Sequence, residues 1–310
     1  MASVTAVVVN YNYGAFVSDC LDSIDRQDHD DLRVLVIDDA STDDSRDIID
    51  TWAATTRRDV VVVHKPRNRG PAHSYNMALR LIRESPTDFV AFIDSDDTWE
   101  PTKTSRQVAR FDASPGSTVV VWSDTGRNTG PGTDRVDRAR PAPGTGSDRT
   151  THILRHGSPF ALNGTLLRWS AVSRIRPFDE SLRLCDLPLW LQMSRQGEFV
   201  HEPMLAGMIR VHPGSMSRTD LSADRLRILA ANTQTRAERV AARERGHDAL
   251  ARLLRSPVRP PAGAYVAYAR ATRDPWTIPF AVRLALPSAA VPHLIRLRGR
   301  LPARTPSRQD

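Results

Sequence analysis

The sequence predicts an α/β protein with a Rossmann-like, mostly parallel sheet flanked by helices and followed by a C-terminal helical extension. Three observations lead to this prediction. Short apolar runs alternate with helical patterns over the first hundred residues. Several of these runs end in polar or acidic residues. The last ninety residues carry the chain's net positive charge and a different, helical periodicity.

Four apolar runs predict the strands, and four segments with helical spacing predict the helices that follow them. The predicted strands are residues 5–10, 32–37, 60–64 and 89–94. The predicted helices are residues 16–26, 41–53, 72–84 and 100–111. Strict alternation of strand and helix favours a parallel sheet, and ligands of such sheets bind beyond the carboxyl ends of the strands.

An acidic turn follows the fourth predicted strand, where Asp94, Asp96 and Asp97 stand within four positions. Three clustered carboxylates repel one another unless a cation or several hydrogen-bond donors balance them. Hard divalent cations such as Mg²⁺ accept carboxylates together with water or phosphate oxygens. The turn therefore predicts a metal–diphosphate site. The alternative is a helix N-cap with solvated acids, since Asp97 precedes a predicted helix.

Four motifs, in order and at fitting spacings, resemble the family 2 glycosyltransferases, which have the nucleotide-diphospho-sugar-binding GT-A fold. The matching stretches are Val8-Val9-Asn10-Tyr11-Asn12, Val36-Ile37-Asp38-Asp39-Ala40-Ser41-Thr42-Asp43, Asn68-Arg69-Gly70 with Asn76, and Phe92-Ile93-Asp94-Ser95-Asp96-Asp97 with Trp99, Pro101, Lys103 and Gln107. The resemblance extends over about residues 4 to 217. It implies a transferase that uses a nucleoside-diphosphate sugar and Mn²⁺ or Mg²⁺.

The resemblance also implies roles for individual residues. Asp39 would contact the nucleotide base, Tyr11 would stack near it, and Asp96 and Asp97 would hold the ribose and the metal. The full set for the donor is Val9, Tyr11, Asp38, Asp39, Asn68, Asn76, Asp94 and Asp96, and the set for the metal is Asp96, Asp97 and His212. Asp186 would be the catalytic base. The family usually has Glu-Asp at this point, where the chain has Cys185-Asp186.

The implied reaction moves a sugar, expected to be UDP-linked, to an acceptor hydroxyl. One carboxylate can deprotonate that hydroxyl, while a divalent cation neutralises the leaving diphosphate. A single base with in-line attack predicts inversion at the anomeric carbon. Two alternatives stay open: a nucleotide-sugar-binding protein without catalysis, and a nucleotidyltransferase. The second would need a glycine-rich, lysine-containing phosphate loop near the N-terminus, and the sequence has none there.

The composition places further bounds on partners and compartment. Two cysteines without metal-ligand spacing argue against a disulfide framework, and no signal-peptide pattern or long uncharged apolar run is present. We therefore expect a cytoplasmic protein. The acceptor would be a glycan, a lipid-linked sugar or a small molecule, and no nucleic-acid partner is expected.

The charge divides the chain into a catalytic domain, residues 1–220, and a basic, mainly helical extension, residues 221–310. The extension carries 17 Arg and no Lys against six acids. Residues 221–254 predict one or two helices. Residues 275–301 interleave apolar clusters with Pro and Arg, which allows either packing on the catalytic domain or peripheral contact with the inner face of the membrane. Residues 125–149, rich in Gly, Pro and Thr, predict a mobile loop.

Overall fold

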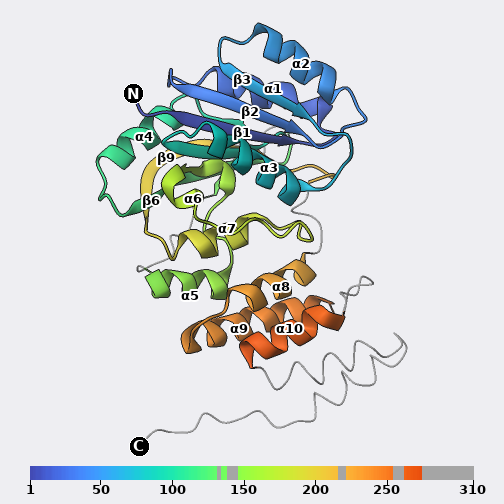
Figure 1. Ribbon diagram of the computed structural model, residues 1–310, viewed down its shortest axis with the longest axis vertical. Helices are drawn as coiled ribbons and strands as arrows, with labels where there is room; N and C mark the ends of the chain where they lie inside the picture. The colour runs from blue at the N-terminus through green and yellow to red at the C-terminus, as the bar shows by residue number, and fades with distance from the viewer. Residues whose placement is uncertain (131–133, 138–145, 216–220, 254–261, 274–310) are drawn as a thin grey trace, which may run out of the picture. The chain divides into compact units, whose positions relative to one another are not determined.

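The computed structural model describes residues 1–130, 134–137, 146–215, 221–253 and 262–273 (Figure 1). The chain forms two compact units, Met1–Asp224 and Arg225–Asp310. The predicted boundary after residue 220 lies close to this division. That residues 1–220 carry the catalysis stays a prediction.

The first unit is built on a mixed sheet that, over the described residues, has nine strands. They are β1 (Val4–Asn10), β2 (Leu32–Asp38), β3 (Asp59–His64), β4 (Phe89–Asp94), β5 (Thr98–Trp99), β6 (Thr118–Asn128), β7 (Arg135–Asp137), β8 (Thr165–Arg168) and β9 (Glu198–Arg210). The order is β3-β2-β1-β4-β8-β6-β9-β5, with β7 paired to β6. The four predicted strands form the parallel half, and the predicted fold class is confirmed.

The other half of the sheet departs from the parallel pattern. Strand β8 is antiparallel to both β4 and β6, whereas β9 is parallel to β6 and antiparallel to β5. An apolar run predicts a buried strand but carries no information about its direction. The sequence therefore predicts the parallel half and leaves the second half open.

Helices cover both faces of the parallel strands, and Figure 1 shows α1 and α2 on the side opposite α3. The helices of this unit are α1 (Gly14–Asp25), α2 (Ser45–Thr55), α3 (Pro71–Glu84), α4 (Lys103–Asp112), α5 (Gly146–His156), α6 (Trp169–Val172) and α7 (Asp186–Met193), with a short 3₁₀ turn η1 at Leu162–Gly164. Alternate residues of β1, such as Ala6 and Val8, pack in one core with Leu21 of α1 and Ile49 of α2. Successive side chains of a strand point to opposite faces, so these alternate residues line one face of the sheet. The residues between them are buried too, as expected for a strand covered on both faces.

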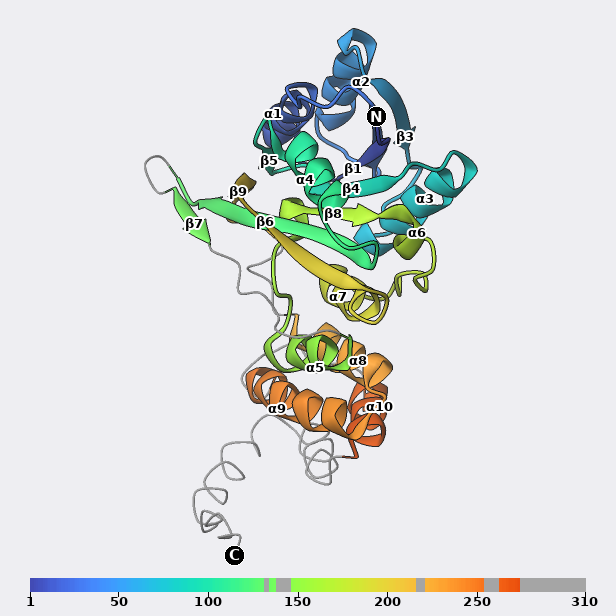
Figure 2. The same ribbon diagram turned by 90° about the vertical axis from the view of Figure 1, so that its left-hand side faces the viewer.

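The prediction of a mobile loop over residues 125–149 is wrong for the described part of that stretch, which forms strands and the start of a helix. Strand β6 continues to Asn128, β7 pairs with it through Gly126 and Val136, and α5 begins at Gly146 (Figure 2). Strand pairing is made by backbone hydrogen bonds, so polar residues can take part in it. The polar side chains of this stretch therefore do not predict its strands. Residues 131–133 and 138–145 lie outside the described residues.

The second unit contains helical segments that agree with the periodicity of residues 221–254. The helices that begin in or near it are α8 (Ser222–Asn232), α9 (Arg236–Leu253) and α10 (Ala262–Thr272). A reciprocal cap starts α9, because Glu238 N–H donates to Thr235 Oγ1 and Thr235 N–H donates to the Glu238 carboxylate. The membrane or packing role predicted for residues 275–301 lies outside the described residues. Among the described helices, none combines the length and apolar character needed to cross a bilayer.

Candidate active site

The ends of β1, β2 and β4 are joined through one buried amide, that of Asn10. Its Nδ2 donates to Asp38 Oδ1 and to Ser41 Oγ, each at 3.0 Å, and its Oδ1 accepts the Ser95 hydroxyl at 2.8 Å. Asp38 also accepts from Ser41 N–H and from Arg46 Nε. Burial acts to raise the pKa of Asp38, but the hydrogen bonds from Ser41, Asn10 and Arg46 hold it below its usual value. Asp38 therefore fixes the loop after β2, and its predicted contact with the donor stays a prediction.

Asp39 follows Asp38 in the chain and forms a buried ion pair with Lys65. Its Oδ1 accepts Arg69 N–H at 2.9 Å and meets the Lys65 ammonium, and both side chains are at most 3% exposed. The Lys65 ammonium also lies 3.1 Å from Ser74 Oγ. The loop that carries Arg69 is thus tied to the carboxylate predicted to recognise the base.

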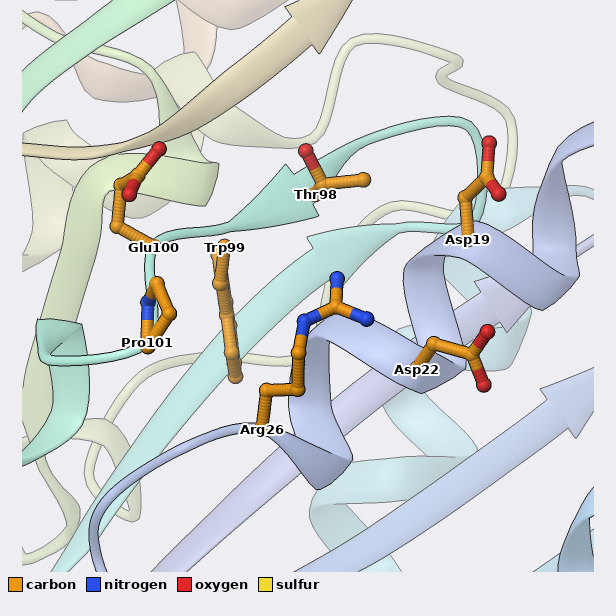
Figure 3. Close-up of a pocket in the computed structure, with 7 residues that line it drawn as sticks. All are labelled: Asp19, Asp22, Arg26, Thr98, Trp99, Glu100 and Pro101. Atoms are coloured by element: carbon orange, nitrogen blue, oxygen red, sulfur yellow. The ribbon is translucent and has the colours of Figure 1, made fainter.

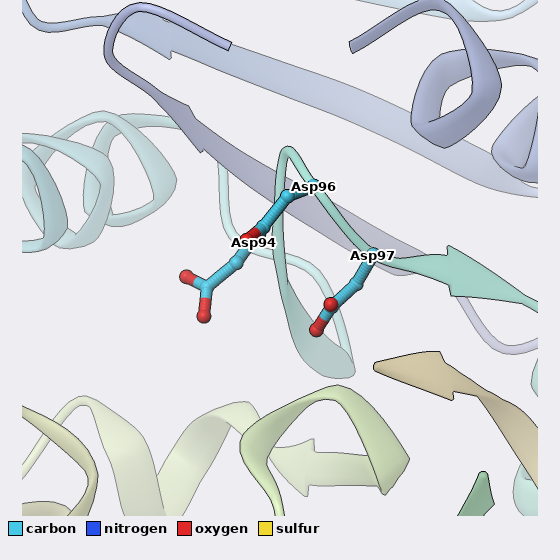
Figure 4. Close-up of side chains that lie close together, drawn as sticks. All are labelled: Asp94, Asp96 and Asp97. Carbon is cyan, nitrogen blue, oxygen red and sulfur yellow. The ribbon is translucent and has the colours of Figure 1, made fainter. Parts of the chain in front are cut away.

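The acidic turn after β4 brings three carboxylates together (Figure 4). One oxygen from each of Asp94, Asp96 and Asp97 lies within 4.8 Å of the others. Asp94 accepts the Tyr75 hydroxyl at 3.0 Å, and Asp97 accepts Arg210 N–H at 3.0 Å. Three hard oxygen donors at this spacing match the ligands that Mg²⁺ and Mn²⁺ prefer. The donor set therefore fits the predicted metal.

The electrostatics of the turn favour a cation. Burial, then the Asp96 charge, raises the pKa of Asp94 to about 6, and Asp186 adds to this effect. Burial, then Asp94 and Asp96, raises the pKa of Asp97 well above its usual value. Solvent reaches the Asp94 carboxylate although protein surrounds it densely. Burial and the three acids also raise the pKa of Tyr13 to about 12. The hydrogen bonds from Tyr75 and Arg210 balance the charge of these carboxylates only in part, and a divalent ion would balance it further.

His212 closes over the turn from the end of β9. Its Nε2 lies 3.1 Å from Asp96 Oδ2, and its ring centroid lies 4.7 Å from that of Phe16 and 5.4 Å from that of Tyr13. Gly214 N–H donates to Nδ1 at 3.2 Å. The structure thus brings His212 to the acids with which it was predicted to act.

Asp186 is the first residue of α7. Its side chain is half-buried, and Oδ1 accepts Leu187 N–H at 2.7 Å. The Asp186 charge helps to raise the pKa values of Asp94, Tyr75 and Cys185. Asp186 therefore lies within electrostatic reach of the acidic turn, although it is 92 residues away from Asp94 in the sequence.

The remaining predicted donor residues occupy different environments. Tyr11 is 43% exposed beyond the end of β1, and Val9 pairs with Ile37 and Asp94 in the sheet. Asn68 accepts Gly70 N–H within its own loop. Asn76 is buried, and its amide bonds the backbone of Phe178. Contact of these residues with a donor stays a prediction.

Three residues of the fourth motif have a shared task that sequence reasoning missed. Each donates to one of three consecutive backbone carbonyls where η1 ends and β8 begins. The bonds run from Trp99 Nε1 to Asn163 O (3.0 Å), from Gln107 Nε2 to Gly164 O (2.9 Å) and from Lys103 Nζ to Thr165 O (3.0 Å). Lys103 and Gln107 are four residues apart on one face of α4, whereas Trp99 lies on β5. A single sequence does not reveal that the three share one stretch of acceptors.

A hollow lies between α1 and β5, and the three acids of the turn do not line it (Figure 3). Its volume is about 310 Å³. The lining residues are Asp19, Asp22, Arg26, Thr98, Trp99, Glu100 and Pro101. Asp19 binds the Arg210 guanidinium at 2.9 Å, so this surface also helps to hold the end of β9.

Solved structures with the same architecture are GT-A glycosyltransferases. TarS 1-349 of S. aureus is 16% identical, with a TM-score of 0.66 over 96% of this chain and 92% of that chain. The mannosyltransferase PcManGT of Pyrobaculum calidifontis is 21% identical, with a TM-score of 0.51 over 96% of this chain and 79% of that chain. These similarities establish the fold, which is GT-A as predicted.

The sequence itself gives the family. Residues 5–169 match Glycosyl transferase family 2. Relatives include the uncharacterized glycosyltransferase alr2836 of Nostoc sp., 28% identical over 57% of this chain and 54% of that protein, and the succinoglycan biosynthesis protein ExoW of Rhizobium meliloti, 35% identical over 36% of each. The matches thus extend over about half or less of these relatives' lengths. The chain therefore belongs to glycosyltransferase family 2, as predicted.

Proposed function

We propose that the protein transfers a sugar from a nucleoside diphosphate, UDP in particular, to an acceptor hydroxyl with inversion of the anomeric carbon. One observation carries the proposal. Three carboxylates converge within 4.8 Å at the end of β4, and Asp186 lies within electrostatic reach of them. A binding protein or a nucleotidyltransferase gives no reason for a separate acid within electrostatic reach of these carboxylates.

The acidic turn would hold Mn²⁺ or Mg²⁺ through Asp96 and Asp97, with His212 beside them. When bound, such an ion neutralises charge on a departing diphosphate. Arg210 keeps the Asp97 carboxylate in place through its backbone N–H, and Tyr75 does the same for Asp94 through its hydroxyl. Orientation of ligating carboxylates by such outer contacts is usual in metal sites.

The donor base would meet Asp39. A carboxylate accepts the imide N–H of uracil, and the backbone of Arg69 with the Lys65 ammonium fixes Asp39 for that contact. The fold neighbours support UDP in part: the S. aureus TarS structures include complexes with UDP and with UDP-GlcNAc. PcManGT was solved with GDP-Man and Mn²⁺.

Asp186 would be the general base for the acceptor hydroxyl. A half-buried carboxylate at the start of α7 can accept a proton while its other contacts keep it oriented. With one base on the acceptor side and no protein nucleophile assigned, attack is direct, and the anomeric configuration inverts.

The acceptor is proposed from the relatives. The E. coli protein WfaP, 29% identical over 35% of this chain, is named as a UDP-Glc:alpha-D-GlcNAc-diphosphoundecaprenol glucosyltransferase. The S. epidermidis match is named teichoic acid poly(glycerol phosphate) polymerase. We favour a lipid-linked or polymeric glycan over a small molecule, met at the inner face of the membrane. The basic extension would then lie near anionic lipid.

A screen of nucleotide-sugar turnover with and without Mn²⁺ tests the proposal. We expect release of UDP from one UDP-sugar, dependent on Mn²⁺ or Mg²⁺ and abolished by EDTA. Undiminished turnover in EDTA would exclude the metal role. Pyrophosphate release from a nucleoside triphosphate and a sugar phosphate would instead identify a nucleotidyltransferase.

A further inference from the structure

Two adjacent residues of α3, Tyr75 and Asn76, make side-chain contacts that join separate parts of the site. The Tyr75 hydroxyl donates to Asp94 Oδ1 at 3.0 Å. Asn76 Nδ2 donates to Phe178 O at 2.9 Å, and Phe178 N–H donates back to Asn76 Oδ1 at 2.8 Å. Both residues are buried. One turn of α3 therefore binds Asp94 at the end of β4 through Tyr75 and, through Asn76, the segment that leads to Asp186.

The ring of Tyr75 reinforces this link. Its centroid lies 5.3 Å from that of Phe92 on β4, edge to face, and 5.7 Å from that of Phe178. Burial, then Asp94 and Cys185, raises the pKa of Tyr75 well above its usual value, and Asp186 contributes too. Tyr75 thus lies between the acidic turn and the start of α7.

The segment 178–186 is also held at its far end. Asp224 Oδ2 accepts Arg183 N–H at 2.8 Å and Leu184 N–H at 3.3 Å. Near its start, the Glu180 carboxylate binds the Arg69 guanidinium at 2.9 Å, but both side chains are over a third exposed, so this ion pair contributes little. The buried Asn76–Phe178 bonds are the stronger attachment at that end.

We propose that Tyr75 and Asn76 are positioning residues, which set the distance between the acidic turn and Asp186. The inference rests on the proposed function, in which Asp186 is the base. It accounts for the Cys185 departure from the family pattern: a buried thiol that lies 3.7 Å from Arg183 O cannot orient Asp186 as a charged neighbour would. Leu187 N–H holds one oxygen of the Asp186 carboxylate, and the contacts of Phe178 with Asn76 help to place the segment that carries Asp186. A small misplacement of a reacting group is enough to slow a reaction about 100-fold.

The first test removes the Asn76 bonds and uses Arg83→Ala as the matched control. Arg83 lies on the same helix and also donates to a backbone carbonyl, that of Ser173, at 2.7 Å. We expect Asn76→Ala to lower kcat about 10- to 100-fold. UDP affinity should be unchanged, because both polar atoms of the Asn76 amide bond the Phe178 backbone and the inference replaces its predicted donor contact. Arg83→Ala should leave kcat near wild type. Equal losses of kcat in both variants would overturn the proposal.

Hydrogen exchange provides a readout that needs no turnover. In Asn76→Ala, the amides of residues 176–182 should exchange about tenfold faster, because Phe178 N–H loses its acceptor. The amides of β4 should be unchanged. If Asn76→Ala does not fold, Asn76→Asp carries the test through kcat, because it keeps an oxygen for Phe178 N–H but loses the donor to Phe178 O. Unchanged exchange over residues 176–182 in Asn76→Ala, or a wild-type kcat in Asn76→Asp, would overturn the role of Asn76.

Tyr75→Phe tests the other contact. The variant keeps the ring against Phe92 and Phe178 but deletes the hydroxyl that orients Asp94. We expect Mn²⁺ binding, measured by calorimetry with UDP present, to weaken about tenfold. Unchanged Mn²⁺ affinity would overturn the role of Tyr75. If the wild type transfers no sugar from any donor, the proposed function fails, yet the exchange and calorimetry still decide whether these residues hold the segment and Asp94.

Discussion

The imidazole of His212 lies 3.1 Å from the Asp96 carboxylate and is fixed by a hydrogen bond from Gly214 N–H to its other nitrogen. Because Nδ1 accepts that bond, the neutral ring carries its proton on Nε2 and donates it to Asp96. His212 follows the end of β9, and Asp96 lies in the turn after β4. Their contact therefore joins the segment after β9 to the acidic turn.

Replacing His212 by Ala should weaken metal activation. We expect the Mn²⁺ concentration for half-maximal activity to rise about 10- to 100-fold, the usual cost of losing a ligand or its support. His201→Ala is a suitable control, because His201 also lies on β9 beside an acid, Asp124 at 3.6 Å. An equal rise in both variants would argue against a metal role for His212.

Without metal, the fold should lose stability as pH rises. The pKa of Asp94 is raised from 3.8 to about 6, so the folded state holds a proton that the unfolded state has released between these values. Stability falls over that window and stays lower above about pH 6. Asp94→Asn keeps an oxygen for the Tyr75 hydroxyl and should flatten this part of the curve. Melting temperatures from about pH 4 to 7 check this, and Mn²⁺ should raise the wild-type value at about pH 7.

Identical slopes in wild type and Asp94→Asn would show that the acidic turn does not destabilise the metal-free protein. A comparison of the two proteins is needed because other groups titrate over the same range.

Loss of Asp39 should remove any preference for uracil, but the structure changes which variant is informative. Asp39→Ala would leave the Lys65 ammonium buried without its partner, at a cost of about 3–5 kcal/mol. The double variant Asp39→Asn/Lys65→Met avoids this charge. We expect it to fold and to lose about 1–3 kcal/mol of the difference between UDP and ADP binding, measured by calorimetry. Equal binding of UDP and ADP by the wild type would refute base recognition by Asp39.

Lys103 should make the protein more stable in mild alkali. Burial lowers its pKa from 10.5 to about 7, so the unfolded chain binds a proton that the folded chain does not between these values. Stability therefore rises with pH across that window. Lys103→Met should remove the slope but also the bond to Thr165 O. Urea unfolding at about pH 7, 8 and 9 measures it, and parallel slopes in the two proteins would contradict the prediction.

The parallel half of the fold follows from the sequence because its signals are local. Each of the strands β1 to β4 is mainly a run of apolar residues, and acids stand where the runs of β2 and β4 end. The strand ends of a parallel sheet share an edge, so the order of runs and acids along the chain is enough to predict that Asp39 and Asp94 lie at the same edge.

The rest of the site depends on contacts between distant residues, which periodicity does not contain. The predicted donor residue Asn76 bonds the backbone of Phe178, 102 positions away. Lys65, after β3, pairs with Asp39, after the neighbouring strand β2. The direction of β8 and the ending of β6 likewise depend on backbone pairing. Buried polar groups must find partners, but the sequence does not say which ones.

Asp186→Asn is the decisive variant for the proposed mechanism. The amide retains an oxygen for Leu187 N–H and therefore the start of α7, but it cannot take a proton. We expect kcat to fall about 10²- to 10⁴-fold, the usual contribution of a general base. UDP affinity, measured by calorimetry with Mn²⁺, should be unchanged, since the acidic turn and Asp39 are intact. If the variant instead weakens UDP binding and spares kcat, Asp186 belongs to the donor side. The base must then be sought at Asp179 or Glu180, which lie on the segment that leads to Asp186.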